Sequence, residues 1–274
     1  MSRKTIRKDK LVIMDGSMAG MLLRYGLHDD ERALWESPDT VLEIYREYIQ
    51  AGADAISTFT MNANRIGLRP LGLEEKAYET ALLGTQLARK ASEGRVLVGG
   101  NVGQLKVKYL RKGSIIALYK EQIRGLWEGG ADFIHIRSFT RSSMVKDVLL
   151  AIDKLGCDLP VMVTMHVQEP EEVRRMEQFF AAIPDRPYMA LGICGCCGRG
   201  GTDICRKMKS LTDKPIAFCR DIEKDERTAL QHDRGQVLAV TMRPSIYEGL
   251  VDYVGGNIGG SPEGICGLKT VSSE

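Results

Sequence analysis

The amino-acid sequence predicts an α/β protein of the (β/α)8 TIM-barrel class, on three observations. Short apolar runs that suit β-strands recur along the chain, and helical patterns lie between most of them. There are eight such runs, and no long linker or low-complexity segment interrupts them. Parallel strands need helical crossovers, and closure into a barrel removes the sheet edges. A doubly wound open sheet is the alternative.

The predicted strands share a run of apolar residues followed by a polar residue or glycine at the carboxyl end. They span residues 11–16, 54–60, 95–103, 132–139, 160–167, 188–195, 215–221 and 253–259.

The clearest predicted helix covers residues 37–52. Ser37 suits the N-cap, Pro38 suits the first helical position, and Gly52 suits the end of the helix. Apolar residues between them follow helical spacing. The same pattern predicts helices within residues 73–92, 114–130 and 142–156.

The C-terminal end is short for a last strand-helix unit. Little chain remains after Gly259, and Gly264 and Gly267 disfavour a long helix there. We therefore expect one barrel over residues 1–274 with a short final helix. A second subunit is expected to cover that side, which predicts a homo-oligomer.

Composition excludes several classes of protein. The chain has 274 residues, 43% of them hydrophobic, and a formal net charge of +2. We expect no nucleic-acid role, because no basic cluster is interleaved with aromatic residues. No apolar run is long enough for a membrane span or a secretory core, so we expect a cytoplasmic protein. Seven cysteines in such a chain suggest thiols or metal ligands rather than disulfides.

In a barrel of this class, chemistry takes place at the carboxyl ends of the strands. Polar residues and cysteines occur at all eight predicted strand ends. In chain order they include Asp15, Ser57, Thr58, Thr60, Asn64, Asn101, Arg137, His166, Cys194, Cys219 and Asn257.

The stretch "GICGCCGRGG", residues 192–201, places Cys194, Cys196 and Cys197 at the end of the sixth strand. Three thiols on a glycine-rich loop can adopt the tetrahedral geometry of zinc, with one position left open for a substrate. The alternatives are a tight turn that contains small buried thiols, and a redox function. A phosphate loop is disfavoured, because the stretch lacks the lysine and hydroxyl that end such a loop.

Four segments resemble the homocysteine S-methyltransferase family, in which zinc barrels methylate a thiol. They are "VIMDGSMAGMLL", "ALWESPDTVLEIYREYIQAGADAISTFTMNANRIGL", "VLVGGNVG" and "GGNIGGSPEGI". They occur in the family's order over nearly the whole chain. The resemblance implies a methyltransferase barrel in which zinc activates a thiol.

The zinc positions depart from the family pattern. That pattern has one cysteine in "GxNC" on strand 6 and two in "GGCCG" on strand 8. Here Asn257 and Ile258 replace the pair, and Gly195 replaces the strand 6 ligand. We therefore predict a relocated zinc site formed by Cys194, Cys196 and Cys197, or by two of these with Cys219.

The substrate positions also depart from the family. Its glutamate on strand 4 helps to hold the ammonium group of homocysteine, but Arg137 stands there in this chain, and Ser57 stands at the acidic position of strand 2. A guanidinium repels an ammonium and binds a carboxylate, sulfonate or phosphonate. The alternative is that Arg137 pairs internally with Asp15 or another acid.

Asp15 and His166 are the candidate catalytic residues, although a strand-end histidine often only bonds a backbone carbonyl. Ser57, Thr58, Thr60, Asn64, Asn101, Arg137 and Asn257 are the candidate substrate-binding residues. Asn64 could equally fix the loop after strand 2.

Two functions remain open from the sequence. The first is a methyltransferase that moves a methyl group to or from a small thiol or anionic compound. Its donor would be a small molecule, or a corrinoid on a separate protein, because the chain has no "DxHxxG" cobalamin pattern. The second is a barrel that has lost thiol activation and serves in ligand binding or assembly.

Overall fold

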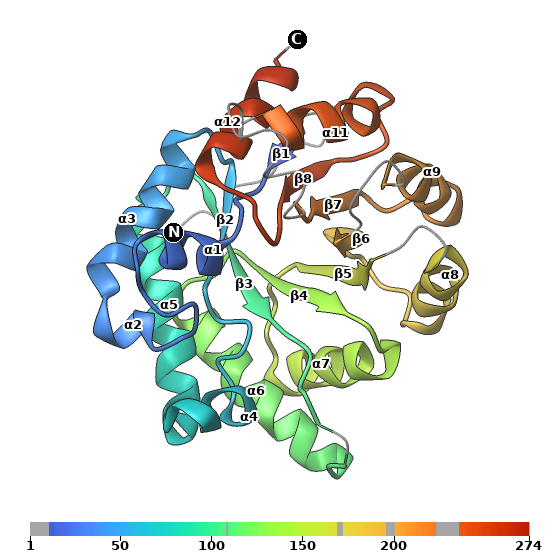
Figure 1. Ribbon diagram of the computed structural model, residues 1–274. Coiled ribbons are helices and arrows are strands. Elements are labelled where there is room, and N and C mark those ends of the chain that lie inside the picture. Colours follow the sequence, from blue (N-terminus) through green and yellow to red (C-terminus); the bar gives the residue numbers. More distant parts are fainter. Residues whose placement is uncertain (1–10, 108, 169–171, 196–200, 223–235, 274) are drawn as a thin grey trace.

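Eight parallel strands surrounded by helices make up the molecule, a (β/α)8 barrel in a single domain, as predicted (Figure 1). The computed structural model describes residues 11–107, 109–168, 172–195, 201–222 and 236–273. The strands are β1 Val12–Ile13, β2 Ala55–Ser57, β3 Leu97–Val102, β4 Phe133–Phe139, β5 Val161–Val167, β6 Ala190–Gly195, β7 Ile216–Arg220 and β8 Tyr253–Gly256. Each lies within its predicted run.

The sheet closes between its two end strands. Each strand pairs in parallel with the next one along the chain from β2 to β8, and β8 pairs with β1. A bridge between Met14 and Ala55 joins β1 to β2, and the N–H of Asp15 donates to the carbonyl of Ala55 at 3.0 Å. The ring is therefore complete, and the carboxyl ends of all eight strands surround one mouth.

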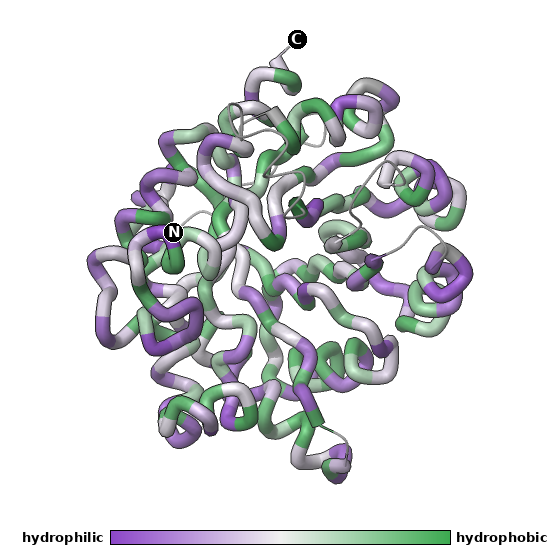
Figure 2. Tube along the Cα trace, viewed as in Figure 1, coloured by the Kyte–Doolittle hydropathy of each residue, from purple (hydrophilic) through white to green (hydrophobic). Residues whose placement is uncertain are grey.

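The helices follow the predicted alternation. They are α1 Met18–Arg24, α2 Ala33–Glu36, α3 Pro38–Gln50, α4 Arg65–Leu68, α5 Ala77–Ser92, α6 Lys112–Glu128, α7 Ser142–Leu155, α8 Val173–Ala182, α9 Gly201–Leu211, α11 Gln236–Tyr247 and α12 Pro262–Val271. Hydrophilic and hydrophobic segments alternate along the outer helices, as amphipathic helices require (Figure 2). None of the described helices could cross a membrane.

Helix α3 begins and ends where the sequence predicts, with one difference. Ser37 occupies the N-cap position and Pro38 the first turn, but the Ser37 side chain accepts no hydrogen bond from the helix. Proline at the start of the helix removes one N–H that would otherwise need a partner. The position of the helix start is therefore set without a side-chain cap.

The C-terminal segment covers its side of the barrel with residues of this chain. Helix α12 is short, as expected, and it packs against α11, the helix between β7 and β8 (Figure 1). A second subunit is therefore not needed to cover this side of the barrel, and a homo-oligomer stays a prediction.

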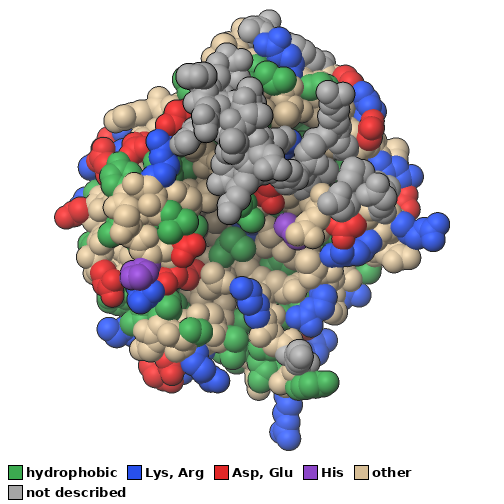
Figure 3. All heavy atoms as spheres, in the orientation of Figure 1, with side chains coloured by type: hydrophobic (Ala, Val, Ile, Leu, Met, Phe, Trp, Pro, Cys, Tyr) green, Lys and Arg blue, Asp and Glu red, His purple; other side chains and the backbone are tan. Residues whose placement is uncertain are grey.

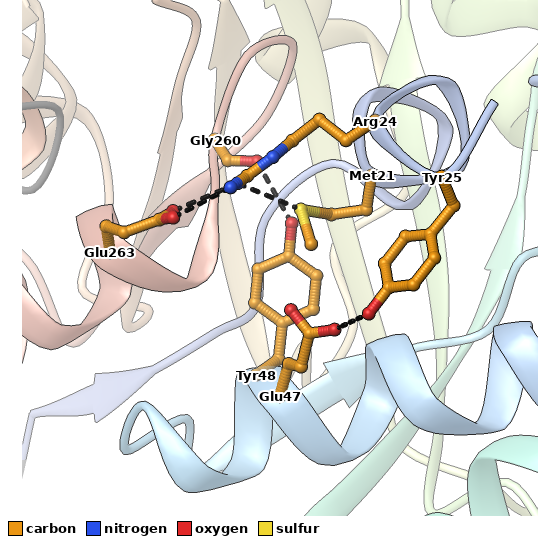
Figure 4. A network of polar contacts seen from close by, with 7 residues as sticks. All are labelled: Met21, Arg24, Tyr25, Glu47, Tyr48, Gly260 and Glu263. Atoms are coloured by element: carbon orange, nitrogen blue, oxygen red, sulfur yellow. Dashed lines mark hydrogen bonds and ion pairs between the residues drawn. The ribbon is translucent and has the colours of Figure 1, made fainter.

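Polar contacts join α12 and the loop before it to α1 and α3 (Figure 4). The guanidinium of Arg24 on α1 forms two hydrogen bonds with the carboxylate of Glu263, at 2.9 and 3.1 Å. The hydroxyl of Tyr48 on α3 donates to the carbonyl of Gly260 at 3.0 Å. These bonds link α1, α3 and the loop after β8 at the junction where the barrel closes.

Two apolar layers form the core. The larger one lies between the strands and the helices. The smaller one takes side chains from all eight strands and fills the barrel interior. It contains Val12, Met14, Ala55, Leu97, Phe133, Met162, Ala190, Cys194, Ala217, Cys219 and Tyr253.

Close packing of the strands predicts a strong effect of one added methyl group. A Cβ atom at Gly192 in β6 would lie 1.9 Å from the carbonyl oxygen of Ala217 in β7, whereas one at Gly113 in α6 would meet nothing within 4 Å. We expect Gly192→Ala to lower the unfolding midpoint by several degrees, since overpacking costs about 1–3 kcal/mol. The control Gly113→Ala should leave the midpoint unchanged or raise it. If Gly192→Ala and Gly113→Ala have equal midpoints in thermal unfolding, the close contact between β6 and β7 at Gly192 is contradicted.

Candidate active site

The predicted polar residues gather at the mouth of the barrel. Strand register places Asn101 beside His135, His166 beside Cys194, and Cys194 beside Cys219, so these strand ends are level with one another. The loop after β8 reaches over the centre of the barrel (Figure 1). Charged side chains of both signs are spread over this face of the molecule (Figure 3).

Arg137 at the end of β4 is the central cation, and its side chain is buried. Its guanidinium donates to the Ser57 hydroxyl at 3.2 Å, to Oδ1 of Asn257 at 3.1 Å, and to the Gly256 carbonyl at 3.4 Å. All three acceptors are neutral. None of the described carboxylates forms an ion pair with Arg137, so the predicted internal pairing with Asp15 is limited to longer-range attraction.

Asn257 connects Arg137 to Asp221, a residue that the sequence analysis missed. The Asn257 amide nitrogen donates to Oδ1 of Asp221 at 2.6 Å, and the N–H of Ile258 donates to the same oxygen at 3.0 Å. Asp221 directly follows β7, where the run "CRD" ends the strand, and this position was the signal available. The polar chain Arg137–Asn257–Asp221 therefore joins the ends of β4, β8 and β7, and Asn257 stands where the resemblance implies a cysteine.

Asp15 is buried near Arg137, and only one of its two carboxylate oxygens has a hydrogen-bond partner among the described residues. Its Oδ2 accepts the N–H of Ser57 at 2.7 Å, while its Oδ1 has no partner among the described residues. Burial raises the pKa of Asp15 to about 6, and the opposing effects of Arg137 and Ser57 are smaller. This carboxyl group therefore changes its charge close to neutral pH.

Cys194 and Cys219 form a buried pair on adjacent strands. Burial works to raise the pKa of Cys194, but hydrogen bonding from Cys219, the charge of Arg137, and bonds from Ser138 and Thr164 lower it to about 6. The bond to Cys194, together with burial, raises the pKa of Cys219 well above its usual value. The pair therefore loses one proton readily and holds the second.

The thiols of Cys194 and Cys219 and the carboxyl group of Asp15 also change the pKa of Arg137. Burial alone would lower the pKa of the guanidinium, but the neighbouring thiols and Asp15 raise it. Arg137 is therefore a permanent positive charge in the mouth.

Only part of the predicted metal site can be placed. Cys196 and Cys197 lie outside the described residues, and among those described no three His, Cys, Asp or Glu side chains form a metal-binding group. Cys194 and Cys219 lie together, as one of the predicted ligand sets requires.

The predicted residues of β2 and β3 largely bond one another. The hydroxyls of Thr58 and Thr60 are 2.6 Å apart, and the Asn101 side-chain nitrogen donates to the Thr58 carbonyl at 3.0 Å. Oδ1 of Asn101 is buried and has no partner within the described ranges. Asn64 caps α4 by accepting the N–H of Gly67, which is the loop-fixing role considered above.

His166 ends β5 and is half-buried beside Cys194. Its ring lies against Gly195, close enough that a Cβ atom at that glycine would be 3.2 Å from Nδ1 of His166. The structure thus places His166 at the mouth, and its catalytic role stays a prediction.

His135 and Thr164 are two buried polar residues that the sequence analysis did not single out. Nε2 of His135 and the hydroxyl of Thr164 are 2.9 Å apart. Burial, followed by the charge of Arg137, lowers the pKa of His135 well below its usual value, so the ring is neutral. The alternation in "FIHIRSF" places His135 on the same strand face as Arg137 and was the signal available.

The raised pKa of Asp15 predicts a pH-dependent effect of Asp15→Asn. The folded protein binds this proton more tightly than the unfolded chain, so wild type loses stability as pH rises from about 4 to 6. Asp15→Asn removes that loss. We expect its free energy of unfolding to exceed that of wild type by an amount on the order of 3 kcal/mol at pH 7, and by little near pH 4.

Urea unfolding across this pH range measures the difference. Asp29→Asn, at an exposed position, controls for the change in net charge. If the difference in free energy of unfolding between Asp15→Asn and wild type does not change with pH, the raised pKa of Asp15 is contradicted.

Comparison with known proteins shows the family to which the chain belongs. The sequence profile of homocysteine S-methyltransferase matches residues 12–271. Homocysteine S-methyltransferase of Escherichia coli K12 is 25% identical over 248 residues, which covers 78% of each chain. Crystal structures of homocysteine methyltransferase MmuM from E. coli superpose with a TM-score of 0.79 and 96% coverage of both chains, at 21% identity for the metallated form and 20% for the oxidized form. The chain belongs to the homocysteine S-methyltransferase family and is a methyltransferase.

Proposed function

We propose that this methyltransferase moves a methyl group to or from a small thiol that carries an anionic group. One observation carries the proposal. Within the described residues, the buried guanidinium of Arg137 at the mouth donates hydrogen bonds only to neutral acceptors. A buried cation that lacks a hydrogen-bonded counter-ion favours a ligand that brings a negative charge.

The same geometry disfavours homocysteine itself, on which the relatives act according to their names. An α-ammonium group placed near Arg137 would be repelled. Of the nearby acids, Asp221 accepts the Asn257 amide, and Asp15 accepts the Ser57 N–H through Oδ2 while its Oδ1 has no partner among the described residues. We therefore infer a thiol substrate with a carboxylate or sulfonate and no ammonium group at this position.

Methyl transfer to such a thiol requires a thiolate and an acceptor for its proton. The substrate sulfur attacks the methyl carbon, a carbon–sulfur bond forms, and the bond between the methyl group and its donor breaks. We assign the thiol proton to Asp15, because a carboxylate whose pKa is about 6 is suited to accept a proton near neutral pH. His166 is the alternative acceptor at this end of the barrel.

Zinc is the cofactor that we propose for this mouth, with Cys194, Cys219, Cys196 and Cys197 as candidate ligands. Cys194 and Cys219 supply two adjacent thiols, half of a tetrahedral set. When bound, zinc keeps a coordinated thiol deprotonated.

The methyl donor is either a small molecule or a corrinoid brought by a separate protein. A cytoplasmic location and a corrinoid partner stay predictions. Methylcobalamin supplied as the free compound, with mass-spectrometric detection of the methylated thiol, tests the corrinoid chemistry directly.

Replacement of Arg137 tests the substrate class. Four probes differ in charge: 3-mercaptopropionate and 2-mercaptoethanesulfonate are anions, 2-mercaptoethanol is neutral, and cysteamine is a cation. We expect Arg137→Gln to weaken binding of the two anions by about 2 kcal/mol, roughly thirtyfold, and to leave the neutral thiol unaffected. Calorimetric titration measures each affinity. Equal losses for charged and neutral thiols would show that Arg137 is structural.

Metal content tests the cofactor. Purified wild type should contain zinc by elemental analysis, and the double variant Cys194→Ser, Cys219→Ser should contain much less. Cys266→Ser is the matched control, since Cys266 is exposed on α12 and should not affect the metal. Wild type that transfers methyl groups without zinc would overturn the proposed cofactor.

A further inference from the structure

The end of β4 carries a local distortion beside Arg137. Ser138 has φ of 58°, in the left-handed region, and it is one of two non-glycine residues of the described chain with positive φ. The pairing of β4 with β5 shifts register between Ile136 and Phe139. A serine in this conformation is strained, so neighbouring groups must hold it.

This distortion decides which way two side chains point. Residues two apart on a regular strand share a face, so Arg137 and Phe139 would point the same way. Instead Arg137 bonds across the mouth to Ser57, while Phe139 belongs to the outer core layer and lies against Tyr119. The left-handed Ser138 allows Arg137 to face the site and Phe139 to face the helices.

The hydroxyl of Thr164 on β5 holds this arrangement. It accepts the backbone N–H of Ser138 at 3.1 Å, and it lies 2.9 Å from Nε2 of His135 and 3.2 Å from the sulfur of Cys194. Thr164 is completely buried. A hydroxyl has one donor and two acceptor sites, so these three partners use its whole capacity.

We propose that Thr164 is a positioning residue of the substrate site. Through Ser138 its hydroxyl aims Arg137 into the mouth, and through its direct contact it orients Cys194. One side chain thus fixes the spacing between the cation and the thiol. The effect on ligand binding rests on the proposed function, whereas the hold on Ser138 does not.

A double-mutant cycle tests whether the Thr164 hydroxyl stabilises the left-handed conformation of Ser138. Thr164→Val removes the hydroxyl at nearly constant volume, and Thr164→Ser keeps it. Ser138→Gly accepts a positive φ without strain. We expect Thr164→Val to lower stability in urea unfolding, and to lower it less when Ser138→Gly is also present. Equal losses in both backgrounds would overturn the proposal.

The ratio of affinities for 3-mercaptopropionate and 2-mercaptoethanol gives a second readout that a merely structural residue would not change. Thr164→Val should reduce this ratio at least tenfold, Thr164→Ser should keep it, and addition of Ser138→Gly to Thr164→Val should restore much of it. A folded Thr164→Val with the wild-type ratio would contradict the role in the site.

Loss of folding is also informative. If Thr164→Val fails to fold and Ser138→Gly rescues it, the hold on Ser138 is supported; if both fail, the proposal is wrong. Wild type that shows no preference for the anionic thiol would contradict the proposed function, and the stability cycle would still decide the role of Thr164.

Discussion

Closure of the sheet between β1 and β2 is the constraint on which the site depends. The joining backbone contacts are few. They are one bridge from Met14 to Ala55 and two hydrogen bonds, from the N–H of Asp15 to the Ala55 carbonyl at 3.0 Å and from the N–H of Asp54 to the Ile13 carbonyl at 2.7 Å. The Asp15 carboxylate adds a further contact between the ends of β1 and β2 by accepting the N–H of Ser57. A proposed catalytic group is thus also part of the closure, although its buried carboxyl group lowers the stability of the fold at neutral pH.

The sequence predicted the architecture because its signals are periodic and local. Each strand is a short apolar run with a polar end, and parallel strands leave all those ends at one mouth. The positions of Asp15, Ser57, Arg137, Cys194 and Cys219 follow from that rule alone. To predict that Cys194 and Cys219 are adjacent, one also needs the register of β6 and β7.

The residues that were missed depend on information that is not periodic. Thr164 matters because of a left-handed residue on a neighbouring strand, and no pattern in "FIHIRSF" predicts that conformation. Asp221 matters because the loop after β8 turns back toward β7. Asn64 shows the reverse case, since a residue considered for substrate binding is used by the backbone as a helix cap.

The departures from the family pattern bond one another. The resemblance implies a glutamate at the position of Arg137 and a cysteine at that of Asn257. In this chain Arg137 donates to Asn257, and Asn257 donates to Asp221. This connected chain of three groups, set beside a thiol pair at the same mouth, supports the proposal that the site binds an anionic thiol.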